Sequence, residues 1–137
     1  MTIHLKKEAY DKMIFHAFAQ LPEEACGLIG GRIEGGEKYI ENVYFLTNIG
    51  HSREHYSLNA KEQLSAVRDM RKNGWEPLGN WHSHPESPSR PSQEDIRLAF
   101  DSSASYLILS LENQTAPVLN SFHVEKDEVE KENLVLE

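Results

Sequence analysis

The sequence predicts a layered α/β domain with a mixed sheet. Segments with apolar residues at helical spacing alternate along the chain with short runs rich in β-branched and aromatic residues. This alternation is typical of helices that pack on a sheet. The chain has 137 residues, of which 39% are hydrophobic, and this suits one domain with a modest core. We find no internal repeat and no linker.

The N-terminal third predicts a helix followed by a hairpin. Residues 6–20 place their apolar side chains on one helical face, and Pro22 ends the helix. Residues 25–33 and 38–46 have the composition of strands, and the stretch EGGE between them supplies a turn.

The middle of the chain predicts a second helix after a longer loop. Asn59 and Glu62 have the spacing of a capping box at its start. Gly74 stands where a C-terminal cap is expected, so we place the helix between these residues.

The remaining elements alternate between strand and helix. Residues 77–82 predict a strand and residues 91–100 a helix. Residues 105–111 are nearly all apolar and predict a central strand, whereas the alternation over 118–125 predicts a half-exposed one.

The C-terminal residues predict a tail outside the domain. Residues 1–125 form the single predicted domain, and 126–137 are highly charged, so we expect them to be frayed or to form a solvated face. Residues 136–137 have the composition of an expression-vector remnant.

Charge and cysteine content exclude several partners and locations. The formal net charge is −8, so the phosphates of nucleic acids and anionic membranes would be repelled. No run of about 18 apolar residues occurs, and the N-terminus lacks the apolar segment of a signal peptide. The lone cysteine, Cys26, rules out an internal disulfide. We therefore expect a cytoplasmic protein.

The stretch WHSHPESPSRPSQED, residues 81–95, carries the chemistry. On a strand, His82 and His84 share one face with Cα atoms about 6.5–7 Å apart, so both imidazoles can reach one ion. A loop stiffened by prolines brings Asp95 back in the first turn of the next helix. Three ligands of this kind leave a coordination position open, which is the mark of a catalytic zinc site.

Plainer interpretations of these residues exist. Two histidines one residue apart are more often polar residues on an exposed strand face than a metal site, and the fixed aspartate and the prolines shift the balance. Ser92 also suits a simple helix N-cap that accepts the Asp95 backbone N–H. The two roles are compatible, because a hydroxyl can accept one hydrogen bond and donate another.

Hydrolysis at such a metal needs a base that takes a proton from water and returns it to the leaving group. The candidates are Glu23 and Glu24, which follow the first helix. From the residues alone, both are more often solvated carboxylates.

The chain resembles the JAMM (MPN-plus) zinc metalloprotease family, and in particular its prokaryotic stand-alone members. The family pattern has a glutamate in a P-x-E-x-x-G context, then HSHP, then PS-x-x-D. The matching residues are Pro22, Glu24 and Gly27, then His82, Ser83, His84 and Pro85, then Pro91, Ser92 and Asp95.

The resemblance implies a three-layer α/β/α, cytidine-deaminase-like fold. It implies one zinc per chain held by His82, His84 and Asp95. It also implies that Glu24 is the general base and acid and that Ser92 donates a hydrogen bond to the oxyanion. Glu23 is one residue out of the family register.

The neighbouring residues have ordinary interpretations. Cys26 is expected to be a small buried side chain near the metal rather than a nucleophile. Trp81 is expected in the core, and Ser83 is expected to point away from the metal and support its ligands. Of the other histidines, His51 and His55 lie in the loop before the second helix, where they could contact substrate. The remaining three, His4, His16 and His123, have no ligand-like spacing.

The resemblance also suggests the substrate. Family members hydrolyse peptide or isopeptide bonds at the C-terminus of ubiquitin-like proteins, and prokaryotic members are associated with sulfur-carrier proteins that end in Gly-Gly. The short connections of this chain argue against polyubiquitin. The alternative is a noncatalytic MPN-type scaffold, which would usually lack the zinc ligands. A zinc nucleoside deaminase is excluded, because one cysteine cannot supply its PCxxC pair.

Overall fold

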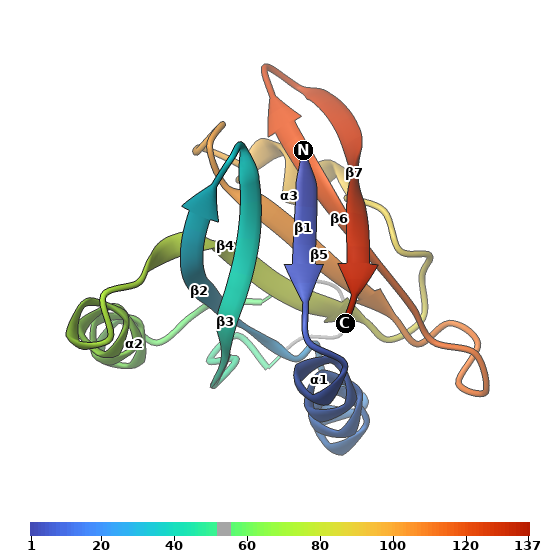
Figure 1. Cartoon of the computed structure of the whole chain (residues 1–137). Coiled ribbons are helices and arrows are strands. Elements are labelled where there is room, and N and C mark those ends of the chain that lie inside the picture. The colour runs from blue at the N-terminus through green and yellow to red at the C-terminus, as the bar shows by residue number, and fades with distance from the viewer. Residues whose placement is uncertain (52–55) are drawn as a thin grey trace.

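The computed structural model describes residues 1–51 and 56–137, and its sheet closes on itself. Neighbouring strands follow the order β1-β3-β2-β4-β5-β6-β7, and β7 returns to β1 (Figure 1). The elements are, in chain order, β1 (Thr2–Leu5), α1 (Lys7–Gln20), β2 (Cys26–Glu34), β3 (Glu37–Leu46), α2 (Ala60–Lys72), β4 (Glu76–His84), α3 (Gln93–Arg97), β5 (Ser105–Ser110), β6 (Val118–Glu125) and β7 (Glu128–Leu136).

Strand directions confirm the predicted mixed sheet and the α/β class. β1 runs parallel to both β3 and β7, and β4 runs parallel to β5, whereas the other neighbours are antiparallel. A three-layer α/β/α arrangement has an open sheet between two layers of helices, whereas this sheet closes on itself. Because the short β1 bridges β3 and β7, the sheet curls into a barrel with an inner and an outer face.

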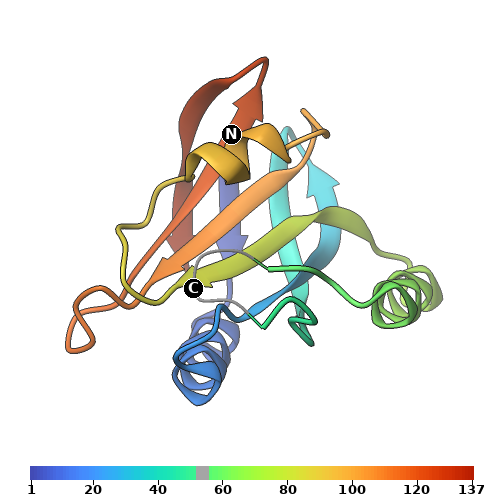
Figure 2. The same ribbon diagram turned by 180° about the vertical axis from the view of Figure 1, so that it is seen from behind.

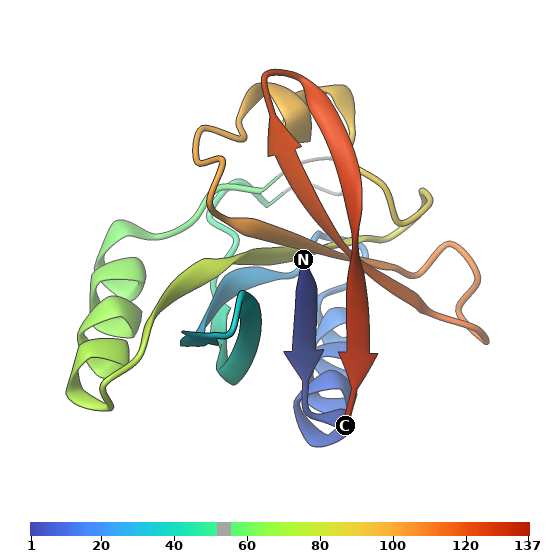
Figure 3. The ribbon, with the colours of Figure 1, turned by 45° about the horizontal axis from the view of Figure 1, so that its top comes forward.

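The helices cover different parts of this barrel. α1 lies across the end where β1 and β7 finish (Figures 1 and 3), and its Met13 and Ala17 are fully buried in the core. α2 packs outside β2 and β4, where a Cβ on Gly30 would press on the Met70 side chain. α3 crosses the outside of the barrel near β5 (Figure 2). Among the described residues, no helix combines the length and the apolar character needed to cross a bilayer.

The side chains of β4 alternate between the two faces of the barrel. Trp81 pairs with Leu107, and all of its side chain lies in the core, where its Nε1–H donates to the Tyr44 carbonyl at 3.1 Å. His82 pairs with Ile108, so it faces the opposite side from Trp81. This confirms that Trp81 belongs to the core.

Ser83 joins β4 to the start of β2. Its side chain is fully buried, and its Oγ accepts the Ala25 N–H at 2.8 Å. In return the Ser83 N–H donates to the Ala25 carbonyl at 2.9 Å. As expected, Ser83 therefore points away from His82 and fixes the backbone beside Glu24.

Gly27 is required by a close approach between strands. A Cβ at this position would overlap the Tyr44 carbonyl oxygen and crowd the Trp81 Nε1. The hydrogen bond between those two groups would then break, so the glycine of the family pattern has a packing reason here.

Most predicted elements are confirmed, but two of them end elsewhere than predicted and one strand was missed. The predicted helix over 91–100 ends at Arg97, because residues 98–100 leave helical geometry. The strand predicted over 77–82 continues to His84, which makes both histidines part of β4. β1 was not predicted, because four residues carry too short an alternation to stand out.

The prediction of a frayed tail over 126–137 is wrong. β7 pairs with β6 over Glu128–Glu132 and with β1 over Asn133–Leu136. Glu128, Glu130 and Lys131 are exposed, whereas Glu132 is buried and accepts the Ser121 hydroxyl at 2.7 Å, and Leu134 packs against the core. Leu136 pairs with Leu5, and the Glu137 N–H donates to the Leu5 carbonyl at 2.9 Å. The proposed vector origin of 136–137 stays a prediction, but both residues take part in closing the barrel.

The predicted capping box of α2 is present only in part. The Asn59 side chain accepts the Lys61 and Glu62 N–H groups, as an N-cap does. The Glu62 carboxylate instead accepts the Thr47 N–H at 2.7 Å and the Thr47 hydroxyl at 2.8 Å. Glu62 therefore ties α2 to the end of β3.

Truncation after Glu125 should greatly destabilise the domain. It removes the β6–β7 and β7–β1 ladders and leaves two open sheet edges. Each backbone hydrogen bond contributes a net ~0.5–1.5 kcal/mol, so this loss is a large part of a typical ~5–15 kcal/mol stability. Urea unfolding measures the effect. The control is the double variant Glu128→Gln/Glu130→Gln, which changes two exposed charges and keeps the ladders. A truncated chain as stable as this control would show that β7 does not stabilise the barrel.

Ser83→Ala should cost about 1–3 kcal/mol in the free energy of unfolding, because the buried Ala25 N–H loses its acceptor. Urea denaturation of the two proteins gives the difference. Ser102→Ala is the matched control, since Ser102 is exposed, and it should change stability by less than ~0.5 kcal/mol. Equal effects of the two substitutions would contradict this role of Ser83.

Candidate metal centre

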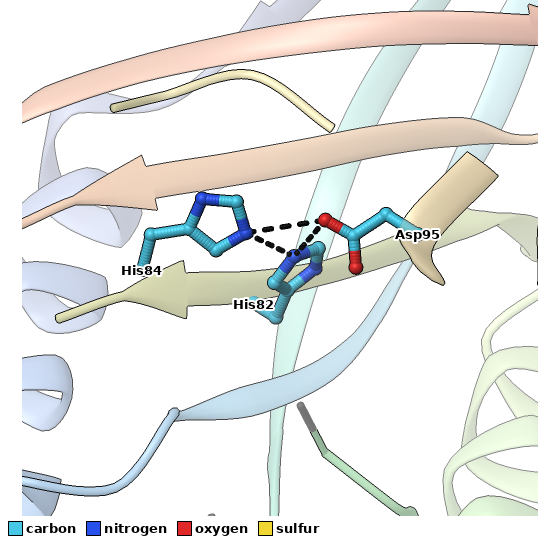
Figure 4. A group of neighbouring side chains, drawn as sticks. All are labelled: His82, His84 and Asp95. Carbon is cyan, nitrogen blue, oxygen red and sulfur yellow. Dashed lines mark hydrogen bonds and ion pairs between the residues drawn. The ribbon is translucent and has the colours of Figure 1, made fainter. Parts of the chain in front are cut away.

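Three side chains converge on the outer face of the barrel. His82 and His84 project from β4 and Asp95 from α3 toward a common point (Figure 4). The two histidine Nε2 atoms lie 3.1 Å apart, and Asp95 Oδ2 lies 3.2 Å from His82 Nε2 and 3.1 Å from His84 Nε2. Within residues 1–51 and 56–137, this is the one group of three or more such side chains close enough to share an ion.

The donor set fits zinc. Two imidazole nitrogens and one carboxylate oxygen are ligands that zinc accepts, and three protein ligands leave the fourth tetrahedral position open. Tetrahedral ligands at ~2.0–2.1 Å from an ion lie about 3.3 Å from one another. The observed separations of 3.1–3.2 Å are therefore close to what one bound zinc requires.

The loop after β4 orients His84. Its Nδ1 lies 2.9 Å from the Pro88 carbonyl oxygen, which can only accept a hydrogen bond. The Nδ1 atom therefore carries the proton, and Nε2 keeps its lone pair for a metal. Nδ1 of His82 is buried and has no hydrogen-bond partner among the described residues.

Asp95 is oriented by a capping box at the start of α3. Its Oδ2 accepts the Ser92 N–H at 2.9 Å, and its own N–H donates to Ser92 Oγ at 3.0 Å. The predicted N-cap role of Ser92 is confirmed. The lone pair of Ser92 Oγ is engaged in this bond, so its hydroxyl hydrogen is available for another acceptor.

Burial and hydrogen bonding set the protonation of the ligands. Burial lowers the pKa of His82, because it disfavours the imidazolium, and the Asp95 carboxylate opposes this only in part. Burial also works against ionisation of Asp95, but hydrogen bonds with His82 and His84 hold the pKa of its carboxyl well below its usual range. A neutral His82 and an ionised Asp95 are the states that metal binding requires.

The two candidate bases have different surroundings. Glu24 is 2% exposed and immediately precedes the backbone that Ser83 holds. Glu23 lies at the surface, where its carboxylate is 3.4 Å from the exposed His51 imidazole. The contrast favours Glu24, because it is buried and the next residue, Ala25, pairs with Ser83 between the two histidines.

Cys26 is buried next to the ligands. It pairs directly with His82 across β2 and β4, and its Sγ lies 3.8 Å from the Leu46 carbonyl oxygen. Burial, followed by the charges of Glu24 and Glu62, raises the pKa of the thiol to about 12. Cys26 is therefore a neutral thiol at neutral pH, in agreement with the expected small buried side chain.

Two residues beside the cluster carried no recognisable sequence signal. The Tyr56 ring lies 4.8 Å, centroid to centroid, from the His82 ring, and burial raises the pKa of its hydroxyl. The buried Asn48 side chain donates to the Glu24 carbonyl at 3.0 Å and accepts the Gly50 and Ser57 N–H groups. Both residues come from a loop whose position depends on tertiary contacts.

The remaining histidines do not join the site. His4 contacts Glu37, His16 packs on Phe45 and Trp81, and His123 lies near Glu125. His51 sits at the surface against Glu23, and His55 lies outside the described residues.

Comparison with known proteins places this geometry in a family. Residues 6–124 match the family described as prokaryotic homologues of the JAB domain. The chain is 29% identical to the CysO-cysteine peptidase of Mycobacterium tuberculosis, over 88% of this chain and 81% of that protein. It is 28% identical to the desampylase of Haloferax volcanii, over 79% of this chain and 80% of that protein.

A solved structure supports the same assignment. The solution structure of a Desulfitobacterium hafniense protein superposes with a TM-score of 0.91 and 52% identity, over 100% of this chain and 93% of that one. The family match covers α1, β2, β4, α3 and the loop that joins His84 to Asp95. The chain belongs to the prokaryotic JAB family, the branch of the JAMM/MPN proteins that the sequence motifs predicted.

Proposed function

We propose that this chain is a zinc metallopeptidase that hydrolyses a peptide or isopeptide bond at the C-terminus of a ubiquitin-like protein of the sulfur-carrier type. One zinc per chain would be held by His82, His84 and Asp95. The observation that carries this proposal is the convergence of three candidate ligand atoms, 3.1–3.2 Å apart. The buried Glu24 precedes Ala25, which pairs with Ser83 between the two histidines.

The named relatives support the reaction class. One is a peptidase named for CysO and cysteine, and another is named as a desampylase. Both names describe enzymes that remove a group from another molecule. A noncatalytic scaffold would have no need of the complete set of His82, His84 and Asp95.

The protein side chains would divide the chemistry among them. A zinc ion held there would polarise the scissile carbonyl and lower the pKa of a water toward ~7. Glu24 takes the proton of the attacking water and gives it to the departing amine. The Ser92 hydroxyl donates a hydrogen bond to the oxyanion, because its oxygen only accepts from the Asp95 N–H and the hydroxyl hydrogen is not used by that bond.

The loops and strands around the site favour a substrate that enters as a narrow, extended tail. The connections around the site are short, and the strand partners of β4 are both filled by β2 and β5. An extended tail that ends in two glycines can pass over the outer face without side chains to obstruct it. This supports a small carrier protein, rather than a polyubiquitin chain, as the partner.

Glu24→Gln should keep the zinc and lower kcat by about 10²–10⁴, because the amide cannot move the proton. Elemental analysis measures the zinc, and cleavage of a fusion between the carrier encoded near this protein and a reporter peptide measures kcat. His82→Ala and Asp95→Ala serve as controls that should lose both zinc and activity.

Two results would count against this assignment. Full activity of Glu24→Gln would show that another group is the base. A wild-type chain that binds zinc but cleaves no carrier fusion would favour the scaffold instead.

Ser92→Ala should lower kcat by about 10²–10³ if the hydroxyl stabilises the oxyanion. It also removes a helix cap, which by itself costs ~0.5–2 kcal/mol of stability. Asn59→Ala is the matched control, because it removes the cap of α2 instead. It should lose similar stability and keep kcat. If kcat fell equally in both variants, the role of Ser92 would be that of a helix cap only.

A further inference from the structure

A cavity of about 430 Å³ adjoins the candidate metal centre. His82 and Asp95 form part of its wall, so any group in the cavity lies beside the reacting bond. Most of the other walls are apolar. They include Leu98, Phe100, Tyr106, Ile108 and Val124. The wall also contains Gln63 and Glu94, whose carboxylate would repel an anionic side chain, so the cavity is suited to an apolar side chain rather than to an anionic one.

Asn80 adds a polar group to this apolar wall. It lies two residues before His82 on β4, so its side chain shares the outer face with the ligand. No hydrogen bond joins its carboxamide to another described residue, and its Oδ1 is buried. An unpaired buried amide costs free energy, and a bound peptide backbone would supply the missing partner.

The spacing along β4 decides which substrate residue reaches the cavity. An extended chain rises ~3.3 Å per residue, so two glycines span about 7 Å. Asn80 and His82 are also two strand residues apart. When the scissile carbonyl lies at the cluster, the first side chain of a tail ending in Gly-Gly falls at the level of Asn80.

We infer that this cavity is the specificity subsite for the third residue from the scissile bond of the carrier tail, and that it selects an apolar side chain there. Asn80 hydrogen-bonds the tail backbone at the same level. The inference rests on the proposed function, because it takes the cluster as the place of cleavage and a Gly-Gly tail as the substrate.

Exposed apolar residues at the rim of the cavity indicate that the bound chain continues beyond the cavity. Leu98 is 46% exposed and Phe100 is 86% exposed, and both follow α3 directly. These apolar groups extend the surface from Asp95 outward. A single amino acid as leaving group would not reach this rim, whereas the tail of a folded carrier must leave the site across a neighbouring surface.

Binding of short product peptides tests the subsite without turnover. The zinc-loaded wild-type chain is titrated with acetyl-Leu-Gly-Gly, acetyl-Asp-Gly-Gly and acetyl-Gly-Gly-Gly, and binding is followed by NMR. Acetyl-Leu-Gly-Gly should bind at least about tenfold more tightly than the other two, in line with the discrimination an apolar pocket provides. The side-chain amide signal of Asn80 should shift on binding.

Two variants locate the effect. Phe100→Ser should weaken binding of acetyl-Leu-Gly-Gly severalfold and leave acetyl-Gly-Gly-Gly unchanged. Phe15→Ser is the matched control, because Phe15 is also highly exposed, at 78%, but lies on α1 away from the cavity. Asn80→Leu should weaken binding of all three peptides, since the backbone contact is common to them.

Equal affinity for the three peptides, or equal effects of Phe100→Ser and Phe15→Ser, would overturn the subsite. The subsite would also be overturned if carrier fusions were discriminated only by the residue on the amine side of the scissile bond. Failure of the proposed function has a different signature, because the wild-type chain would then cleave no fusion whether or not the leucine peptide binds preferentially.

Discussion

A single oxygen atom, Oδ2 of Asp95, holds the candidate site together. It accepts the Ser92 N–H at 2.9 Å and lies within 3.2 Å of both histidine Nε2 atoms. The capping box that begins α3 therefore also aims the third ligand. A helix of five residues has little stability of its own, so the cap and the cluster depend on each other. Burial of the carboxylate becomes tolerable because these partners stabilise its charge.

The barrel makes this arrangement rigid. β4 lies between β2 and β5, and its alternation sends Trp81 into the core while His82 faces outward. A fully paired strand cannot slide by one residue without placing the imidazoles inside the core. The same strand carries Asn80 in line with the ligands. One interior strand thus supplies the two histidines of the cluster and part of the wall of the neighbouring cavity, which fixes the position of the cavity relative to the cluster.

The region around Glu24 shows how backbone contacts can support a reactive group. The Ala25 N–H and carbonyl are both held by Ser83, and the Glu24 carbonyl accepts a hydrogen bond from Asn48. The carboxylate is consequently attached to a backbone with little freedom. A carboxylate held in a fixed position loses less entropy than a mobile one when another group binds to it. Cys26, a neutral thiol in the same row, fills space beside His82.

The sequence by itself predicted the cluster of His82, His84 and Asp95 and most elements, because these depend on local rules. The spacing of His82 and His84 on one strand face, the cap at Ser92 and the apolar runs are all readable within a few residues. It failed for β1 and for β7, since a four-residue strand has little pattern and a charged strand resembles a solvated tail. Only the tertiary structure decided that these two strands pair and close the barrel. It also decided that Tyr56 lies beside His82, that Asn48 holds the Glu24 carbonyl and that Asn80 lines a cavity, because such contacts join residues far apart in the chain.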